Sequence, residues 1–271
     1  MTLFVIFLYL LFLPWSPART TPIHGLFDFF SNQDRQILQA RIALEDASKS
    51  EARALMTPKL FFAALTDYKL WMHCILNILS LSPAGGINVY GPSVIKAFGF
   101  STEHANLLSS VPYFMLIVLA FFVGFMSDLT HRRGPCCLST YVWALIWAGV
   151  QYGLPITAAI NTRYAIFVLL SSGGALGQAL NDAWLNINAT SSTHRSVGLA
   201  LVVIGSNLGG LAGVNLFQAD DAPRYSRAWL GILCLYASSI VVTCLMILAY
   251  MWENRRFRLK NPRAKSPRFQ I

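Results

Sequence analysis

One acidic residue, Asp182, stands well inside a long apolar stretch, and no other acidic or basic residue of the chain does. An unpaired carboxylate is costly to bury in an apolar medium, so a residue of this kind is a candidate for function. Gly174, Gln178 and Asn181 share helical spacing with Asp182 and would form one polar face. Two roles are open for Asp182: proton coupling, or a gating ion pair with a residue such as Arg195. The ion pair is favoured, because Asp182 lies close to the end of its apolar stretch and within reach of Arg195.

A second cluster connects the end of one apolar stretch to the start of the next. It reads Gly124-Phe-Met-Ser-Asp128-Leu-Thr-His131-Arg132-Arg133. A small residue permits close helix packing, an acid can pair at a helix end, and a basic pair can anchor a short loop at lipid headgroups. Such a cluster could hold helices in one conformation and release them in another. A positively charged loop with a chance acid is the alternative.

Polar residues elsewhere in the apolar stretches mark candidate substrate contacts. Pro83 to Gly86, followed by Pro92, are expected to interrupt a helix, and broken helices at membrane depth are tolerated where they line a cavity. An ordinary kink is the alternative. The predicted substrate-binding residues are Asn88, Tyr90, Gln178, Asn181 and Asn207.

Six apolar stretches carry these residues, each about long enough to cross a bilayer. The expected spans are 70–95, 106–126, 138–160, 164–186, 197–217 and 228–252. The chain is 55% hydrophobic and only 12% charged, and helices that are apolar all round are typical of a lipid environment. Short connections make successive helices antiparallel neighbours. These features predict an all-α membrane protein with a six-helix transmembrane bundle.

Small residues within the stretches predict packing. Gly205, Gly209 and Gly213 repeat every four residues, which permits close contact between two helices. We expect Gly173, Gly174 and Gly177 to serve packing as well.

The remaining segments and the charges suggest an orientation. Residues 1–14 are expected to form a partial transmembrane helix, 15–69 a cytoplasmic loop with an amphipathic helix, 70–252 the bundle and 253–271 a basic cytoplasmic tail. The amphipathic helix would open with a capping box at Ser31 and Asp34. Of the 21 Lys and Arg residues, 17 lie on the side of the tail, which places that side in the cytoplasm. The glycosylation acceptor Asn188-Ala189-Thr190 would then face the cytoplasm, where it cannot be used.

Several classes of function are not indicated. The net charge of +9 comes from basic residues in the connections and the tail, so it indicates orientation rather than a nucleic-acid partner. The five cysteines and five histidines show no spacing typical of metal ligands or of a catalytic pair. We therefore expect no enzyme activity, no catalytic residue, no metal and no cofactor.

The cluster at 124–133 resembles the signature loop of the major facilitator superfamily. Gly124, Asp128, Arg132 and Arg133 match that loop position by position, and His131 stands where a glycine is usual. Over nearly the whole chain the resemblance is to the fungal anion:cation symporters, which include the allantoate permeases. The segments that carry it are Leu13-Pro14-Trp15-Ser16-Pro17, Asp67-Tyr68-Lys69-Leu70-Trp71, Ala183-Trp184 with Asn188, His194-Arg195 and Asp220-Asp221-Ala222-Pro223-Arg224-Tyr225.

The resemblance implies one half of a twelve-helix carrier, from near the end of helix six through helix twelve. Such carriers form their cavity between two halves, so a homodimer or a missing N-terminal half would complete it. The implied function is proton-coupled transport of small organic anions such as allantoate, vitamins or carboxylates, most simply at the plasma membrane. The expected cytoplasmic gate comprises the four matched residues Gly124, Asp128, Arg132 and Arg133, together with Asp182 and Arg195 from the expected ion pair. The alternative is a truncated, non-transporting membrane protein that associates with or regulates full-length carriers.

Overall fold

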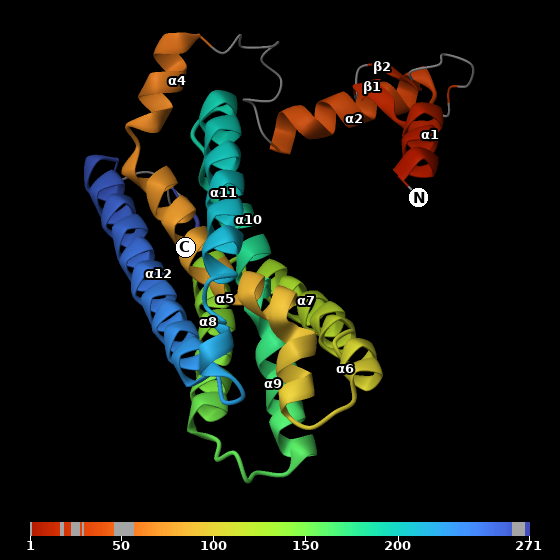
Figure 1. The fold of residues 1–271 in the computed structure, drawn as a ribbon. Coiled ribbons are helices and arrows are strands. Elements are labelled where there is room, and N and C mark those ends of the chain that lie inside the picture. The colour runs from red at the N-terminus through yellow and green to blue at the C-terminus, as the bar shows by residue number, and fades with distance from the viewer. Residues whose placement is uncertain (1, 17–18, 23–27, 29, 46–56, 262–268) are drawn as a thin grey trace. The chain divides into compact units, whose positions relative to one another are not determined.

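A computed structural model describes residues 2–16, 19–22, 28, 30–45, 57–261 and 269–271 (Figure 1). The described residues are mainly α-helical. A short antiparallel pair, β1 (Pro14–Ser16) and β2 (Arg19–Pro22), is the one sheet among them. The chain divides into two compact units, one of Met1–Thr57 with Ser191–Thr193 and one of Pro58–Thr190 with His194–Ile271.

The first unit contains the strand pair and two helices, α1 (Thr2–Phe12) and α2 (Asn32–Glu45). The predicted capping box is confirmed at the start of α2. The Ser31 hydroxyl donates to Asp34 Oδ2 at 2.7 Å, and the Asp34 N–H donates to Ser31 Oγ at 3.2 Å. The hydrogen bonds from the Ser31 side chain and backbone hold the pKa of the Asp34 carboxyl below its usual range.

The second unit is a set of packed helices. They are α4 (Pro58–Leu65), α5 (Tyr68–Ala97), α6 (Thr102–Leu108), α7 (Val111–Thr130), α8 (Arg133–Gly153), α9 (Ile160–Gly174), α10 (Leu176–Asn188), α11 (Ser192–Gly213, of which the part from His194 onward belongs here), the 3₁₀ helix η1 (Ala219–Asp221) and α12 (Ser226–Lys260). In Figure 1, α8 and α12 run side by side, and α8 also packs against α9 and α10. Aromatic and aliphatic side chains, among them Tyr141, Trp184 and Tyr236, fill the core.

Four helical stretches of the described residues are long and apolar enough to cross a membrane: Tyr68–Ala97, Thr102–Thr130, Ser192–Gly213 and Ser226–Lys260. The chain is therefore a multi-pass, all-α membrane protein. α8 and the α9–α10 pair coincide with the other two expected spans but do not meet the same criteria of length and hydropathy. The expected span 164–186 is divided at Ala175 into helices of 15 and 13 residues. The count of six crossings stays a prediction.

The glycine repeat of α11 packs against α5, as the spacing predicted. A methyl group added at Gly205 would lie 2.6 Å from the Cys74 carbonyl oxygen, and one added at Gly209 would lie 2.8 Å from the Ile78 carbonyl oxygen. Since neither position has room for a side chain, the two backbones are in direct contact. Gly173 and Gly177 likewise pack, against the aromatic side chains of α8.

The predicted interruption near Pro83 is wrong, because α5 continues from Tyr68 to Ala97 with Pro83 and Pro92 inside it. Each proline removes one backbone donor, but unsatisfied backbone groups are so costly in lipid that the rest of the helical ladder is retained. Gly85 supports this segment by packing on the backbone of Gly210. Asn88 therefore projects from a regular helix.

Candidate functional site

A buried polar network is centred on Asn77 of α5. Its Nδ2 donates to Asp182 Oδ1 of α10 at 3.1 Å and to Ser206 Oγ of α11 at 3.2 Å. Its Oδ1 accepts from Asn181 Nδ2 at 2.8 Å. Asn77 and Asn181 are both fully buried. One asparagine thus connects three helices and holds the carboxylate.

His73, one turn before Asn77 on α5, extends the network to α12. It is fully buried, with Nδ1 2.6 Å from Asn181 Oδ1 and Nε2 3.1 Å from the Tyr250 hydroxyl. The Asn181 amide nitrogen donates to the His73 carbonyl and to Asn77, so its oxygen must be the acceptor. The imidazole proton is therefore assigned to Nδ1, and the Tyr250 hydroxyl donates to Nε2 of the neutral ring.

The result is a hydrogen-bonded chain from a carboxylate through two amides to an imidazole and a phenol. Gln178 joins it from α10, since its Nε2 donates to Ser206 Oγ at 3.1 Å. Asp182 and His73 are the two members that can change charge near neutral or acidic pH. Sequence reasoning identified Gln178, Asn181 and Asp182 but missed the part played by His73 and Asn77. The signal was present as two polar residues four apart on an apolar helix.

Asp182 has no ion-pair partner among the described residues. It is half-buried, and its hydrogen bond comes from the neutral Asn77 amide. Arg195, the expected partner, donates through Nε to the Asn186 carbonyl at 3.3 Å. The expected gating ion pair between Asp182 and Arg195 is thus not observed among the residues that the structure describes.

The signature turn forms its own ion pair. Arg133 Nη2 lies 2.5 Å from Asp128 Oδ1, and Arg133 Nη1 donates to Ser127 Oγ at 3.0 Å. His131 ends α7 in the left-handed conformation with φ of 53°, which explains physically why a glycine is suited to this position. A methyl group added at Gly124 would meet no described atom within 4 Å, so the close packing expected there is not observed among the described residues.

A small cavity of about 100 Å³ lies within the second unit between α5, α7, α9 and α12. Asn88 lines it and accepts a hydrogen bond from the Tyr113 hydroxyl at 3.1 Å. The hydroxyls of Ser171 and Tyr236 line the same cavity, and neither has a hydrogen-bond partner in the described part of the chain. Buried polar atoms are normally paired, so these two groups are candidates for contact with a ligand.

Two predicted contact residues lie elsewhere. Tyr90 packs against Phe217, with 5.6 Å between the ring centroids. Asn207 is exposed and donates to the Val203 carbonyl of its own helix at 2.9 Å. The structure brings neither to the cavity or to the polar network.

A charged cluster joins the start of α5 to α11 and α12. Asp67 caps α5 and accepts a hydrogen bond from His194 Nε2 at 2.9 Å, while Lys69 Nζ lies 3.0 Å from Glu253 Oε1. Burial alone would raise the pKa of the Asp67 carboxyl, but hydrogen bonds from His194 and from the Lys69 N–H hold that pKa below its usual range. This cluster fixes one end of the α5–α11–α12 group.

These features define a helical membrane protein with a buried, titratable polar network. No protein-family model matches the chain. It is 27% identical over 237 residues to an uncharacterized transporter of Schizosaccharomyces pombe, covering 84% of this chain and 45% of that protein. It is also 27% identical over 195 residues to a high-affinity nicotinic acid transporter of Saccharomyces cerevisiae, covering 70% and 35%. A major facilitator-type transporter of Emericella nidulans is 21% identical over 229 residues, covering 84% and 46%.

The predicted resemblance to major facilitator transporters is confirmed by these relatives. The chain spans less than half the length of each of the three. The narrower resemblance to the allantoate permeases stays a prediction.

Proposed function

We propose that the chain supplies one six-helix half of a proton-coupled carrier for small organic anions. The observation that carries this proposal is the buried carboxylate–amide–imidazole network between α5, α10, α11 and α12. Ionisable groups inside membrane helices are costly and mark ion or proton pathways. The names of the relatives support transport, and one of them supports nicotinic acid as the first substrate to try.

Protonation of Asp182 can be coupled to helix movement through Asn77. The Asn77 amide nitrogen has three acceptors within 3.2 Å: Asp182 Oδ1, Ser206 Oγ and the Val202 carbonyl. A protonated carboxyl attracts the amide less strongly than a carboxylate does. The Asn77 donors would then shift towards α11, so the charge on Asp182 would decide how α5 is bonded to its two neighbours.

The substrate would contact the wall formed by Asn88, Tyr113, Ser171 and Tyr236. These side chains offer neutral amide and hydroxyl donors, which can bind a carboxylate. The cavity of about 100 Å³ is smaller than the roughly 300 Å³ at which small-molecule sites begin. A second half, from another copy or another polypeptide, would complete the site. Gln178 and Asn181 would act through the network rather than on the substrate.

The signature turn would act as the cytoplasmic gate. Its Asp128–Arg133 ion pair connects α7 to α8 and can break when the two helices separate. We assign Gly124, Arg132 and Arg195 to the same cytoplasmic gate. We also place the 253–271 tail in the cytoplasm and the protein in the plasma membrane.

Uptake of radiolabelled nicotinate tests the proposal. Yeast cells without their own nicotinate uptake would express the chain alone or together with the N-terminal half of the nicotinic acid transporter. We expect uptake above the empty-vector level that increases as the external pH falls. No uptake in either combination, with the chain present in the membrane, would overturn the transport proposal.

A matched pair of variants tests the coupling. Asp182→Asn keeps the shape of the side chain but cannot change its charge, so we expect uptake that no longer depends on pH. Glu103→Gln changes an exposed carboxylate on α6 and should retain the pH dependence. Retention of the full pH dependence by Asp182→Asn would remove Asp182 as the coupling residue.

A further inference from the structure

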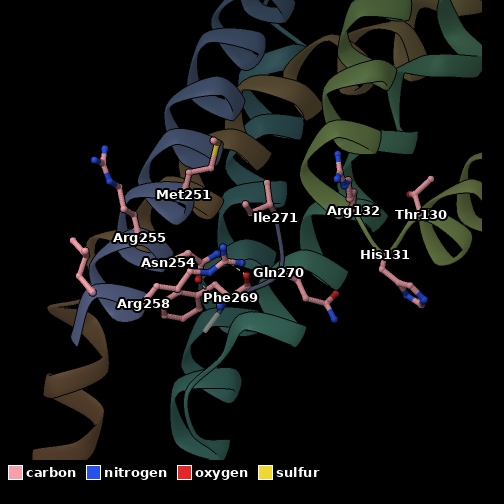
Figure 2. Close-up of a pocket in the computed structure, with 11 residues that line it drawn as sticks. Thr130, His131, Arg132, Met251, Asn254, Arg255, Arg258, Phe269, Gln270 and Ile271 are labelled. Carbon is pink, nitrogen blue, oxygen red and sulfur yellow. Dashed lines mark hydrogen bonds between the residues drawn. The ribbon is translucent and has the colours of Figure 1, made fainter. Parts of the chain in front are cut away.

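The segment Phe269–Ile271 lies against the ends of α10 and α12, where two asparagines, Asn188 and Asn254, hold its backbone. Figure 2 shows the segment beside Asn254 of α12. Asn254 Nδ2 donates to the Phe269 carbonyl at 2.8 Å, and the Phe269 N–H donates to Asn254 Oδ1 at 2.9 Å. Asn188 Nδ2 donates to the Gln270 carbonyl at 2.9 Å, and the Gln270 N–H donates to Asn188 Oδ1 at 2.8 Å.

This pairing recognises the main chain of the segment. The primary amide of asparagine has an NH₂ group that donates and an oxygen that accepts, so it can pair with both the C=O and the N–H of a single residue. Gln270 has a third main-chain hydrogen bond besides its two with Asn188, because Trp184 Nε1 donates to the Gln270 carbonyl at 2.9 Å. The Gln270 side chain takes no part and is exposed. Main-chain hydrogen bonds of this kind provide affinity in peptide recognition, whereas side-chain pockets provide specificity.

The side-chain pocket is occupied by Phe269, which is only 3% exposed. Its ring packs on Tyr250 with 5.4 Å between centroids, and Lys69 Nζ lies 4.7 Å from its centroid. Lys69 is fixed in turn by Glu253. An aromatic residue is therefore held by an aromatic ring and by a cation over its face.

The docked segment also forms one wall of a larger pocket of about 640 Å³. Figure 2 shows Phe269, Gln270 and Ile271 between α12, which carries Met251 and Arg255, and the turn that carries Arg132. The pocket is rich in basic side chains that have no acidic partner among the described residues: Arg132, Arg255 and Arg258. Release of the segment would remove this wall.

We propose that Asn188, Asn254, Trp184 and Tyr250 form a peptide-binding site whose ligand is the chain's own segment 269–271. The ligand class is an extended backbone with an aromatic side chain at its first position. Docking fastens the end of α10 to the end of α12, and undocking opens the basic pocket. This inference does not depend on transport and is tested without it.

Hydrogen exchange of the full-length chain in detergent, read by mass spectrometry, measures docking directly. The variant pair is Gln270→Pro, which removes the N–H that donates to Asn188, and Gln270→Ala, which removes only the exposed side chain. We expect the Phe269 amide to exchange about fivefold more slowly in the wild type and in Gln270→Ala than in Gln270→Pro, since the one hydrogen bond lost from the Gln270 N–H is worth about 1 kcal/mol. Position 270 lies outside every helix, so both variants should keep the bundle intact.

Two further variants test the receptor and the pocket. Asn188→Asp keeps the acceptor but loses the donor to the Gln270 carbonyl, and Phe269→Ala empties the aromatic pocket. Each should also speed exchange of the segment. Equal exchange in Gln270→Pro and Gln270→Ala, or unprotected exchange of the Phe269 amide in the wild type, would overturn the proposal.

Discussion

Replacement of Asn181 by leucine should destabilise the protein through polar loss alone. Asn181 is fully buried, and leucine has nearly the same size and branching, so the change opens no large cavity. Three hydrogen bonds disappear: to His73 Nδ1 at 2.6 Å, to the His73 carbonyl at 3.1 Å and to Asn77 Oδ1 at 2.8 Å.

The magnitude follows from what these bonds are worth between membrane helices. Measured values there average about 0.6 kcal/mol and reach about 1.7 kcal/mol. Three bonds therefore give a loss of about 2 kcal/mol, with about 5 kcal/mol as the upper bound. For a chain of this size, about 2 kcal/mol corresponds to a fall in Tm of roughly 4–8 °C.

A thiol-reactive fluorogenic dye can follow this unfolding in detergent, because Cys74 and Cys137 are buried and become accessible on unfolding. Asn215→Leu is the control, since Asn215 is exposed and bonds only to the preceding turn of its own segment. Adding His73→Phe to Asn181→Leu should restore part of the loss, because two apolar partners leave fewer unpaired groups than one. A Tm for Asn181→Leu equal to that of the control would refute the network as described.

Three further predictions use the same thermal assay. Gly209→Ala should lower the free energy of unfolding by about 1–3 kcal/mol, because the added methyl group would lie 2.8 Å from the Ile78 carbonyl oxygen. Gly153→Ala is the control and should be neutral or stabilising, because an added methyl group there meets no described atom within 4 Å. Equal effects of the two variants would contradict direct backbone contact between α5 and α11. The folded-state pKa of Asp67 lies below the ordinary 3.8, so the ionised carboxylate stabilises the fold fully above pH 3.8, and this stabilisation is lost as the pH falls below 3.8. Asp67→Asn should therefore weaken the dependence of Tm on acid pH, and an unchanged dependence would contradict this role of Asp67. His131→Gly should raise stability by about 1 kcal/mol by relieving the left-handed conformation, and a lower Tm would contradict that account.

Features with a local cause could be predicted from the sequence. Long apolar runs located the helices that can span a membrane, because hydropathy depends on nothing beyond the run itself. The four-residue glycine spacing predicted that α11 packs closely on another helix, and the structure identifies that helix as α5. Ser31 with Asp34 predicted the start of α2. In each case the residues that decide the structure are neighbours in the sequence.

Features that depend on distant partners could not be predicted. Two prolines suggested a broken helix, but packing and the cost of unsatisfied backbone in lipid keep α5 continuous. Asn77 and Asn181 are 104 residues apart, and no local pattern shows that their amides meet. The seating of Phe269 beside Asn254 was equally hidden, because a basic tail gives no sign that its last residues carry a buried aromatic ring.

The glycine contact between α5 and α11 restricts how this part of the protein can move. Where main chain touches main chain over successive turns, neither helix can roll about its own axis without a steric clash. We expect α5 and α11 to tilt together as one rigid body. We then expect the bending in any large rearrangement to occur in the connections of α5 to α4 and α6, and of α11 to α10 and η1.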